Sequence, residues 1–159
     1  MSAEPPGPEP AAGRPAGARS IDEILAAARE RLRRVTPADA YGELGAARAV
    51  LVDIRPAWQR AVDGEVPGSW VIERNHLEWR LDPASSARLP WVSRYDHRIL
   101  VICQEGYTSS LAAAALLDLG LSQSTDVIGG YRAWAAAGLP TAPAAARTAQ
   151  VAMGAVHAG

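Results

Sequence analysis

One stretch decides the fold of this chain: Ile-Leu-Val-Ile-Cys-Gln-Glu-Gly-Tyr-Thr-Ser-Ser, residues 99–110. Its apolar first part predicts a buried strand that ends on Cys103, the only cysteine of the protein. A polar loop with one glycine follows, and residues 111–119 are rich in alanine and leucine at helical spacing. This order places the sulfur atom at the end of a strand and at the N-terminus of a helix, where free N–H groups and the helix dipole favour an anion.

The position of Cys103 alone leaves two interpretations open. Surroundings that favour an anion favour the thiolate, which is the nucleophilic form of cysteine. A lone cysteine is equally well a small buried hydrophobe. The rest of the sequence has to decide between a reactive and an inert thiol.

The composition excludes several classes of function. The 159 residues suit one domain with tails, and the net charge of -1 gives no electrostatic footprint for nucleic acid or an anionic membrane. The longest apolar run, 111–117, is far shorter than the roughly 20 residues that span a bilayer. The N-terminus also lacks the pattern of a secretory signal. These features predict a cytoplasmic protein with no nucleic-acid or membrane partner.

Residues that carry metal or covalent cofactor chemistry are few. A single cysteine excludes an internal disulfide and a Cys-rich zinc site. The absence of lysine excludes Schiff-base chemistry and the lysine of a phosphate-binding P-loop. The three histidines, His76, His97 and His157, show no ligand spacing, so we expect no metal and no cofactor.

Folded structure is expected to begin at Ser20. Residues 1–19 are mostly Pro, Gly, Ala and Glu, and we expect them to be a disordered tail. Ser20 and Glu23 have the spacing of a capping box, and apolar residues then recur at helical spacing. The basic side chains of this helix are expected to form a solvated face, with a partner-binding surface as the alternative; they are Arg29, Arg31, Arg33 and Arg34.

Strand and helix signals alternate through the rest of the chain. Thr36 and Pro37 begin a short helix, and the nearly continuous apolar run 49–54, which includes Asp53, predicts a strand buried on both faces. The alternation from 50 to 137 predicts an α/β domain with a mostly parallel central sheet. Shorter elements are expected at 70–72, 77–81, 125–128 and 131–137, with another short helix opening at Asp82-Pro83; the domain then spans 20–140, and an Ala-rich tail occupies 141–159.

The order of these pieces resembles the rhodanese family of sulfurtransferases. Each of the four patterns that carry the resemblance is weak alone, but together they occur in order and at plausible spacing. They are Asp-Ile-Arg at 53–55, Gly-Glu-Val-Pro-Gly-Ser at 64–69, the six-residue loop at 103–108, and Gly-Gly-Tyr-Arg-Ala-Trp at 129–134 followed by Ala-Gly-Leu-Pro at 137–140.

The resemblance implies a fold and an activity. The fold would be a rhodanese-like α/β domain with a five-stranded, mostly parallel sheet and helices on both faces. Cys103 would carry sulfane sulfur as a persulfide, taken from a small-molecule or protein donor and passed to a thiol or to cyanide. Asp53 and Arg55 are expected to support the site structurally. The backbone N–H groups that would hold the anionic sulfur belong to Gln104, Glu105, Gly106, Tyr107, Thr108 and Ser109.

Four positions depart from the family pattern. Thr108 stands where many active rhodaneses have an arginine five residues after the cysteine, and Ser109 stands where the related phosphatases have theirs. Glu65 replaces the usual histidine, and Glu105 adds a negative charge that opposes anion binding. Because a guanidinium is what binds phosphate bidentately, we do not expect phosphatase or arsenate chemistry.

Three functional hypotheses follow. The leading one is a sulfurtransferase with Cys103 as the persulfide carrier. The alternative is a catalytically weak or inactive rhodanese-like module that binds or regulates a partner, and the third is a thiol redox sensor. The retained cysteine favours the first, and the missing arginine favours the second. Arg74 and Arg80 could supply the absent charge, although we expect them at the solvated surface.

Overall fold

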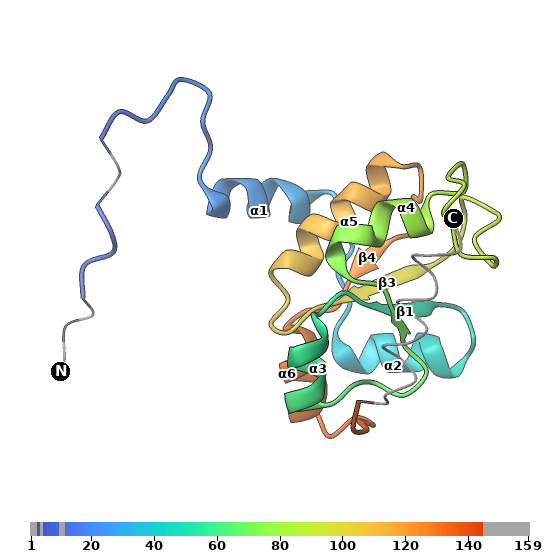
Figure 1. The fold of residues 1–159 in the computed structure, drawn as a ribbon. Coiled ribbons are helices and arrows are strands. Elements are labelled where there is room, and N and C mark those ends of the chain that lie inside the picture. The colour runs from blue at the N-terminus through green and yellow to red at the C-terminus, as the bar shows by residue number, and fades with distance from the viewer. Residues whose placement is uncertain (1–2, 4, 10–11, 145–159) are drawn as a thin grey trace.

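A computed structural model describes residues 3, 5–9 and 12–144 of the protein. At its centre lies a sheet with strand order β2-β1-β3-β4, in which every pairing is parallel (Figure 1). Strands β1 (Val50–Asp53) and β3 (Ile99–Ile102) are the long central pair, and β2 (Trp70–Val71) and β4 (Thr125–Asp126) flank them. Asp53 lies opposite Ile102 in this register, so the residues that follow β1 and β3 meet at one edge of the sheet.

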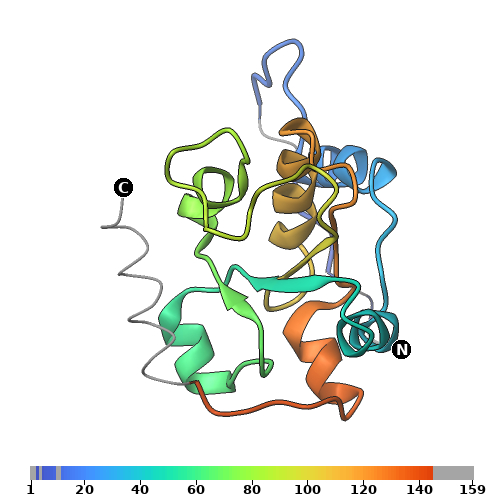
Figure 2. The same cartoon turned by 90° about the vertical axis from the view of Figure 1, so that its right-hand side faces the viewer.

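Helices cover both faces of the sheet, as predicted. Figure 2 shows α1 (Ile21–Glu30), α4 (Leu77–Leu81) and α5 (Thr108–Asp118) on one side, with α2 (Pro37–Gly45), α3 (Ala57–Asp63) and α6 (Gly130–Ala136) on the other. A short 3-10 helix, η1 (Arg74–His76), leads directly into α4. The side chains of each strand alternate between two hydrophobic cores, because successive side chains of a strand point to opposite faces of the sheet.

The two hydrophobic cores follow this alternation residue by residue. Ile99 and Val101 of β3 belong to the core under α4 and α5. Leu100 and Ile102 belong to the core under α2 and α6, together with Trp134. Because all four β3 residues are fully buried, the continuous apolar run that precedes Cys103 is explained by a strand covered on both sides.

The sheet has four strands in the part of the chain that the structure describes, where five were expected. The place of the fifth is taken by Val35, which forms a single parallel bridge with Val127 beside β4. Its N–H donates to Asp126 O at 3.1 Å, and its carbonyl accepts from Ile128 N at 2.8 Å. The bridge cannot lengthen into a strand because Thr36 already caps α2 and Pro37 occupies the first helical position.

Local signals located some elements and misplaced one. The side chains of Ser20 and Thr36 cap α1 and α2 as predicted, each accepting from a backbone N–H at 3.1 Å. The short helix expected at Asp82-Pro83 is wrong. The Asp82 carboxylate instead accepts from Ala84 N at 2.8 Å and closes a turn, which is the alternative use of an aspartate before a proline.

The two ends of the domain differ in how they contact it. The described residues before α1 are exposed coil (Figure 1). At the other end, Ala142 pairs with Glu65 in an antiparallel bridge, with N–O distances of 2.8 and 2.9 Å. Most of the C-terminal tail, 145–159, lies outside the described residues, and the boundaries at 20 and 140 stay predictions. None of the described helices is long and apolar enough to cross a bilayer.

Candidate active site

The Cys103 side chain lies at the end of β3 and is 4% exposed. Its Sγ atom accepts hydrogen bonds from the backbone N–H groups of Gly106, at 3.2 Å, and Ser109, at 3.4 Å. Ser109 lies in the first turn of α5, so one donor comes from the loop and the other from the helix N-terminus. Both donors have the polarity that stabilises a negative sulfur atom.

Glycines let two backbone segments approach closely behind this loop. Gly106 has φ +84°, and a Cβ there would lie 2.7 Å from Gly129 N. A Cβ on Gly130, at φ +62°, would clash with the Cys103 carbonyl oxygen. The first turn of α6 then holds the loop, because Tyr131 N donates to Cys103 O at 2.8 Å and Arg132 N to Gln104 O at 3.0 Å. The Gly-Gly pattern was visible in the sequence, but its contact with the cysteine loop was not.

Asp53 and Arg55 form a buried pair beside the loop. Their side chains are 0% and 1% exposed, and Arg55 Nη2 lies 2.8 Å from Asp53 Oδ2. The same guanidinium donates from Nη1 to Gln104 Oε1 at 3.0 Å and from Nη2 to Gly64 O at 2.8 Å. It also stacks over the Tyr131 ring, 4.1 Å from its centroid. Arg55 therefore ties the cysteine loop to β1, to the turn after α3 and to α6.

The carboxylate of Glu105 has an ion-pair partner that we did not predict. Its Oε1 lies 2.6 Å from Nη1 of Arg132, in the first turn of α6. Both side chains are exposed, so the pair is weak, and it offsets the charge next to Cys103 only in part. This pairing could not be predicted from a local pattern, because 27 residues separate the partners.

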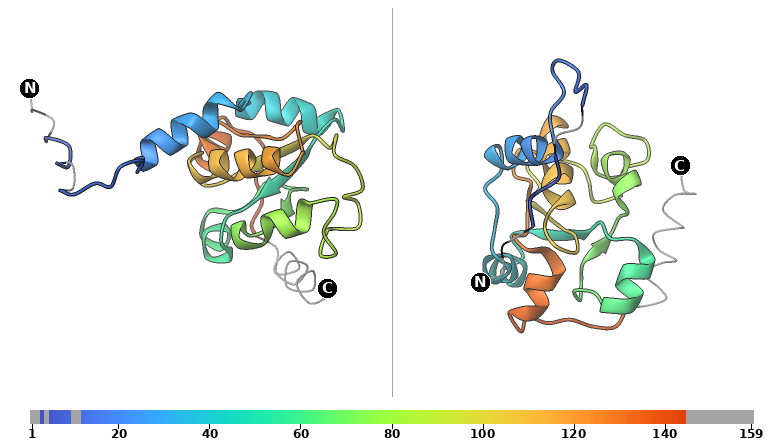
Figure 3. Two further views of the ribbon diagram at one scale, coloured as in Figure 1. Left: turned by 90° about the horizontal axis from the view of Figure 1, so that it is seen from above. Right: turned by 90° about the vertical axis from the view of Figure 1, so that its left-hand side faces the viewer.

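Two arginines assigned to a solvated face reach the cysteine loop instead, and that expectation is wrong for them. Arg29 Nη2 lies 2.8 Å from Gly106 O, and Arg34 Nη2 lies 3.0 Å from the same oxygen. For Arg29 the cause is the packing of α1 against α5, which brings the end of α1 over the start of the loop helix (Figure 3). For Arg34 it is the bridge that the next residue, Val35, forms beside β4. Arg31 and Arg33 are exposed as predicted, and Arg31 pairs with Asp118 at 2.6 Å.

Asp126 completes the surroundings of the loop, and sequence reasoning missed it. Its carboxylate is fully buried and accepts from Ser109 Oγ at 2.7 Å and from Ser110 Oγ at 2.8 Å. Arg34 Nε lies 2.9 Å from its Oδ1. The sequence carried little signal for it, because β4 consists of only two polar residues, Thr125 and Asp126.

Other sequence candidates are engaged away from the loop or lie exposed on it. Arg74 pairs with Glu78 at 2.6 Å, and Arg80 donates to the Ala87 carbonyl, so their bonds are local to α4 and the turn after it. Thr108 and Tyr107 are exposed. No group of three or more potential ligands within the described ranges is arranged to hold a metal ion.

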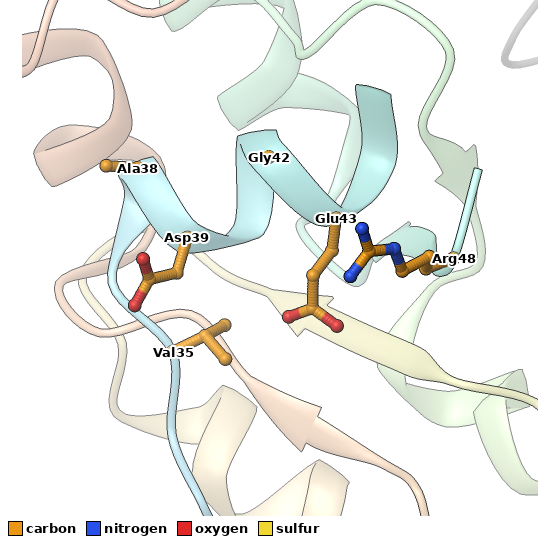
Figure 4. Close-up of a pocket in the computed structure, with 6 residues that line it drawn as sticks. All are labelled: Val35, Ala38, Asp39, Gly42, Glu43 and Arg48. Carbon is orange, nitrogen blue, oxygen red and sulfur yellow. The ribbon is translucent and has the colours of Figure 1, made fainter. Parts of the chain in front are cut away.

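A shallow pocket beside α2 contains none of the predicted site residues (Figure 4). Glu43 in its wall is already bound, because its carboxylate receives both Nε and Nη2 of Arg98 at 2.9 and 3.2 Å. The pocket therefore contributes nothing to the cysteine site. Its lining residues are Val35, Ala38, Asp39, Gly42, Glu43 and Arg48.

Comparisons with known proteins agree with this geometry. A family model described as the rhodanese-like domain matches residues 36–137. Two bacterial proteins named thiosulfate sulfurtransferase GlpE are similar: one from Actinobacillus succinogenes is 30% identical over 67% of this chain and 86% of its own length. The other, from Stutzerimonas stutzeri, is 32% identical over 64% of this chain and 84% of its own length.

Solved structures share the fold. A Rhodopseudomonas palustris protein described as of unknown function and a possible tyrosine phosphatase is 35% identical, with a TM-score of 0.72 over 78% of this chain and 95% of its own. A human single-domain sulfurtransferase is 28% identical, with a TM-score of 0.53 over 65% of this chain and 95% of its own.

Proposed function

The chain belongs to the rhodanese-like domain family, and from that membership we propose that it is a sulfurtransferase whose Cys103 carries sulfane sulfur as a persulfide. One observation carries the proposal: the Cys103 Sγ atom receives the backbone N–H groups of Gly106 and Ser109. Fixed donors aimed at a sulfur atom stabilise the anion that the reaction passes through without reorganising during it. The sulfurtransferase names of the relatives support the same reaction class.

The proposed reaction has two displacement steps. The Cys103 thiolate attacks the outer sulfur of a donor such as thiosulfate, forming a new S–S bond while the donor's own S–S bond breaks and sulfite leaves. The persulfide that results ends in an anionic sulfur. An acceptor thiolate then attacks that terminal sulfur, and the electron pair of the breaking S–S bond returns to Cys103. No metal or redox cofactor takes part in either step, because the bonding changes are confined to sulfur.

We propose that the preferred donor is a low-molecular-weight or protein-bound persulfide, with thiosulfate a poorer one. Thiosulfate carries its charge on a sulfonate, which a loop cation would bind, and the exposed Thr108 supplies none. Glu105 adds little to this deficit, because Arg132 pairs with it.

Phosphatase activity, suggested for the Rhodopseudomonas protein, is not part of the proposal. The position that would need a guanidinium is Ser109, whose side chain is fully buried and bonded to Asp126. A serine there offers no guanidinium to bind a phosphate dianion bidentately.

Mass spectrometry of the intact protein tests the proposal directly. After incubation with a persulfide donor we expect a gain of one sulfur atom that Cys103→Ser abolishes, with a smaller gain from thiosulfate. Iodoacetamide labelling in parallel reports whether the thiol is accessible. A Cys103 that alkylates readily yet takes sulfur from neither donor would contradict the proposal. The loop would then serve as a binding surface, the function that the missing arginine favours.

A further inference from the structure

Two arginines from the N-terminal segment share one acceptor in the cysteine loop. Arg29 Nη2 and Arg34 Nη2 lie 2.8 and 3.0 Å from the carbonyl oxygen of Gly106, whose own N–H donates to Cys103 Sγ at 3.2 Å. We propose that Arg29 and Arg34 are positioning residues for sulfur transfer. They fix Gly106 so that its N–H faces the sulfur, and Arg29 supplies from behind the loop the positive charge that Thr108 does not. This inference rests on the proposed function.

The loop needs an external restraint because Gly106 sits at its bend. Glycine has more backbone freedom than any other residue, and here φ is +84°. A carbonyl oxygen has two lone pairs and can accept two hydrogen bonds. The Gly106 carbonyl oxygen accepts one from each of the two guanidinium groups. Hydrogen bonds from a guanidinium are roughly twice as strong as neutral ones, so the pair holds the peptide between Gly106 and Tyr107 in one orientation.

The same set of side chains holds the second donor to the sulfur. Ser109, whose N–H lies 3.4 Å from Cys103 Sγ, donates its hydroxyl to Asp126, and Arg34 pairs with that carboxylate. Arg29 Nε donates to the hydroxyl of Ser110, which in turn donates to Asp126. Both backbone groups that reach the sulfur therefore depend on contacts that begin at Arg29 and Arg34.

Arg29 contributes charge as well as position. Arg34 is neutralised by Asp126, and Arg132 by Glu105. Among the residues that the structure describes, Arg29 has no carboxylate within ion-pair distance; its contacts are the Gly106 carbonyl, the Ser110 hydroxyl and the Tyr107 ring at 5.7 Å. Its charge is therefore directed at the loop. Both arginines lie outside the matched family range, 36–137, so the site of this chain includes an element that the family model does not.

Cysteine alkylation with a charged and a neutral reagent tests this role. Iodoacetate is an anion and iodoacetamide is not, so the ratio of their rates at Cys103 reports positive potential at the loop independently of sulfur transfer. We expect Arg29→Met to lower this ratio by about three- to tenfold, the effect of one charge-assisted contact only partly replaced by Arg34. Arg29→Lys should restore most of the ratio. Arg31→Met is the matched control, because Arg31 directly follows α1 as its C-cap but pairs with Asp118 at the surface.

Sulfur transfer supplies the second readout. Arg29→Met should lower kcat/KM by a similar factor. The double variant Arg29→Met with Arg34→Met should lower kcat/KM by more than the product of the two single effects, because either arginine alone can still donate to the Gly106 carbonyl oxygen. Thermal melts of the Arg34→Met variant check that it stays folded, because removing Arg34 leaves the buried Asp126 carboxylate without its ion-pair partner. An unchanged alkylation ratio in Arg29→Met, or the same change in Arg31→Met, would overturn the inference. If the native protein transfers no sulfur but the ratio still falls, the positioning role holds and the proposed function fails.

Discussion

Two buried aspartates stand on either side of the strand that carries the cysteine. Asp53 ends β1 and Asp126 ends β4, the two neighbours of β3 in the sheet, and both are fully buried. Each binds an arginine that also contacts the cysteine loop: Arg55 reaches Gln104, and Arg34 reaches Gly106. Separating a buried ion pair leaves an unpaired buried charge, which is energetically costly. Each aspartate therefore holds its arginine in place. The cysteine loop is thus held from both sides by a buried aspartate–arginine pair.

The residue Thr108 provides the sharpest test of donor choice. Thr108→Arg places a permanent cation with a planar donor fork on the exposed side of the loop, where a sulfonate would sit. A charge-assisted hydrogen bond contributes about 1.5 to 3 kcal/mol, or about ten- to a hundredfold in kcat/KM when fully realised in the transition state. We therefore expect transfer from thiosulfate to cyanide to rise in that range, while transfer from a persulfide donor changes little.

The control for Thr108→Arg is Glu105→Ser. This change releases Arg132 from its ion pair and frees a cation at the rim of the loop, so a smaller gain with thiosulfate is expected from it alone. The two changes together should exceed Thr108→Arg, because Glu105 can no longer pair with the new guanidinium. A native protein that already prefers thiosulfate would contradict this account of the loop.

Gly130 tests the contact behind the loop. A Cβ there would clash with the Cys103 carbonyl and lie 2.8 Å from Gln104 C, whereas Gly138 has a similar positive φ with nothing within 4 Å. Gly138→Ala should lose only about 1 to 2 kcal/mol of unfolding free energy, the cost of a left-handed conformation. Gly130→Ala should lose more and also slow sulfur transfer. Equal losses in denaturant unfolding would show that the backbone contact does not matter.

At the scale of elements, the predictable parts are those specified locally. β1 and β3 were found because a strand buried on both faces is a continuous apolar run, and α1 and α2 because their caps are local sequence patterns. Asp53 and Arg55 were found because they lie two residues apart within a family motif. Arg34 and Asp126 were missed because 92 residues separate them, and it is the bridge between Val35 and Val127 that brings them together.

The helix α6 carries a test of the second core. Trp134 is 1% exposed, donates from Nε1 to Pro140 O at 2.8 Å and meets the Tyr41 ring edge-on at 5.9 Å. Trp134→Ala should therefore lower the unfolding free energy by about 3 to 5 kcal/mol, typical of a large aromatic removed from a core. Trp79→Ala is the matched control, because Trp79 is 62% exposed on α4. Urea unfolding of the two variants should differ by at least about 2 kcal/mol.

For the whole molecule, the question is where the domain begins, since the family match starts at residue 36 and our prediction starts at residue 20. Deleting 1–19 should change the unfolding free energy by less than about 1 kcal/mol, because the described residues of that stretch are exposed and bury no apolar surface. Deleting 1–34 removes Leu32 from the core under α5 and takes Arg34 from buried Asp126. Losing the partner of a buried charge alone costs about 3 to 5 kcal/mol, so this shorter chain should be strongly destabilised and inactive. Denaturant unfolding of the two truncated chains decides the point, with Asp126→Asn added to the chain that lacks 1–34 to remove its unpaired charge. If the chain that starts at Val35 is as stable as the full protein, α1 is an appendage, and the bracing of the cysteine loop by Arg29 and Arg34 has no energetic weight.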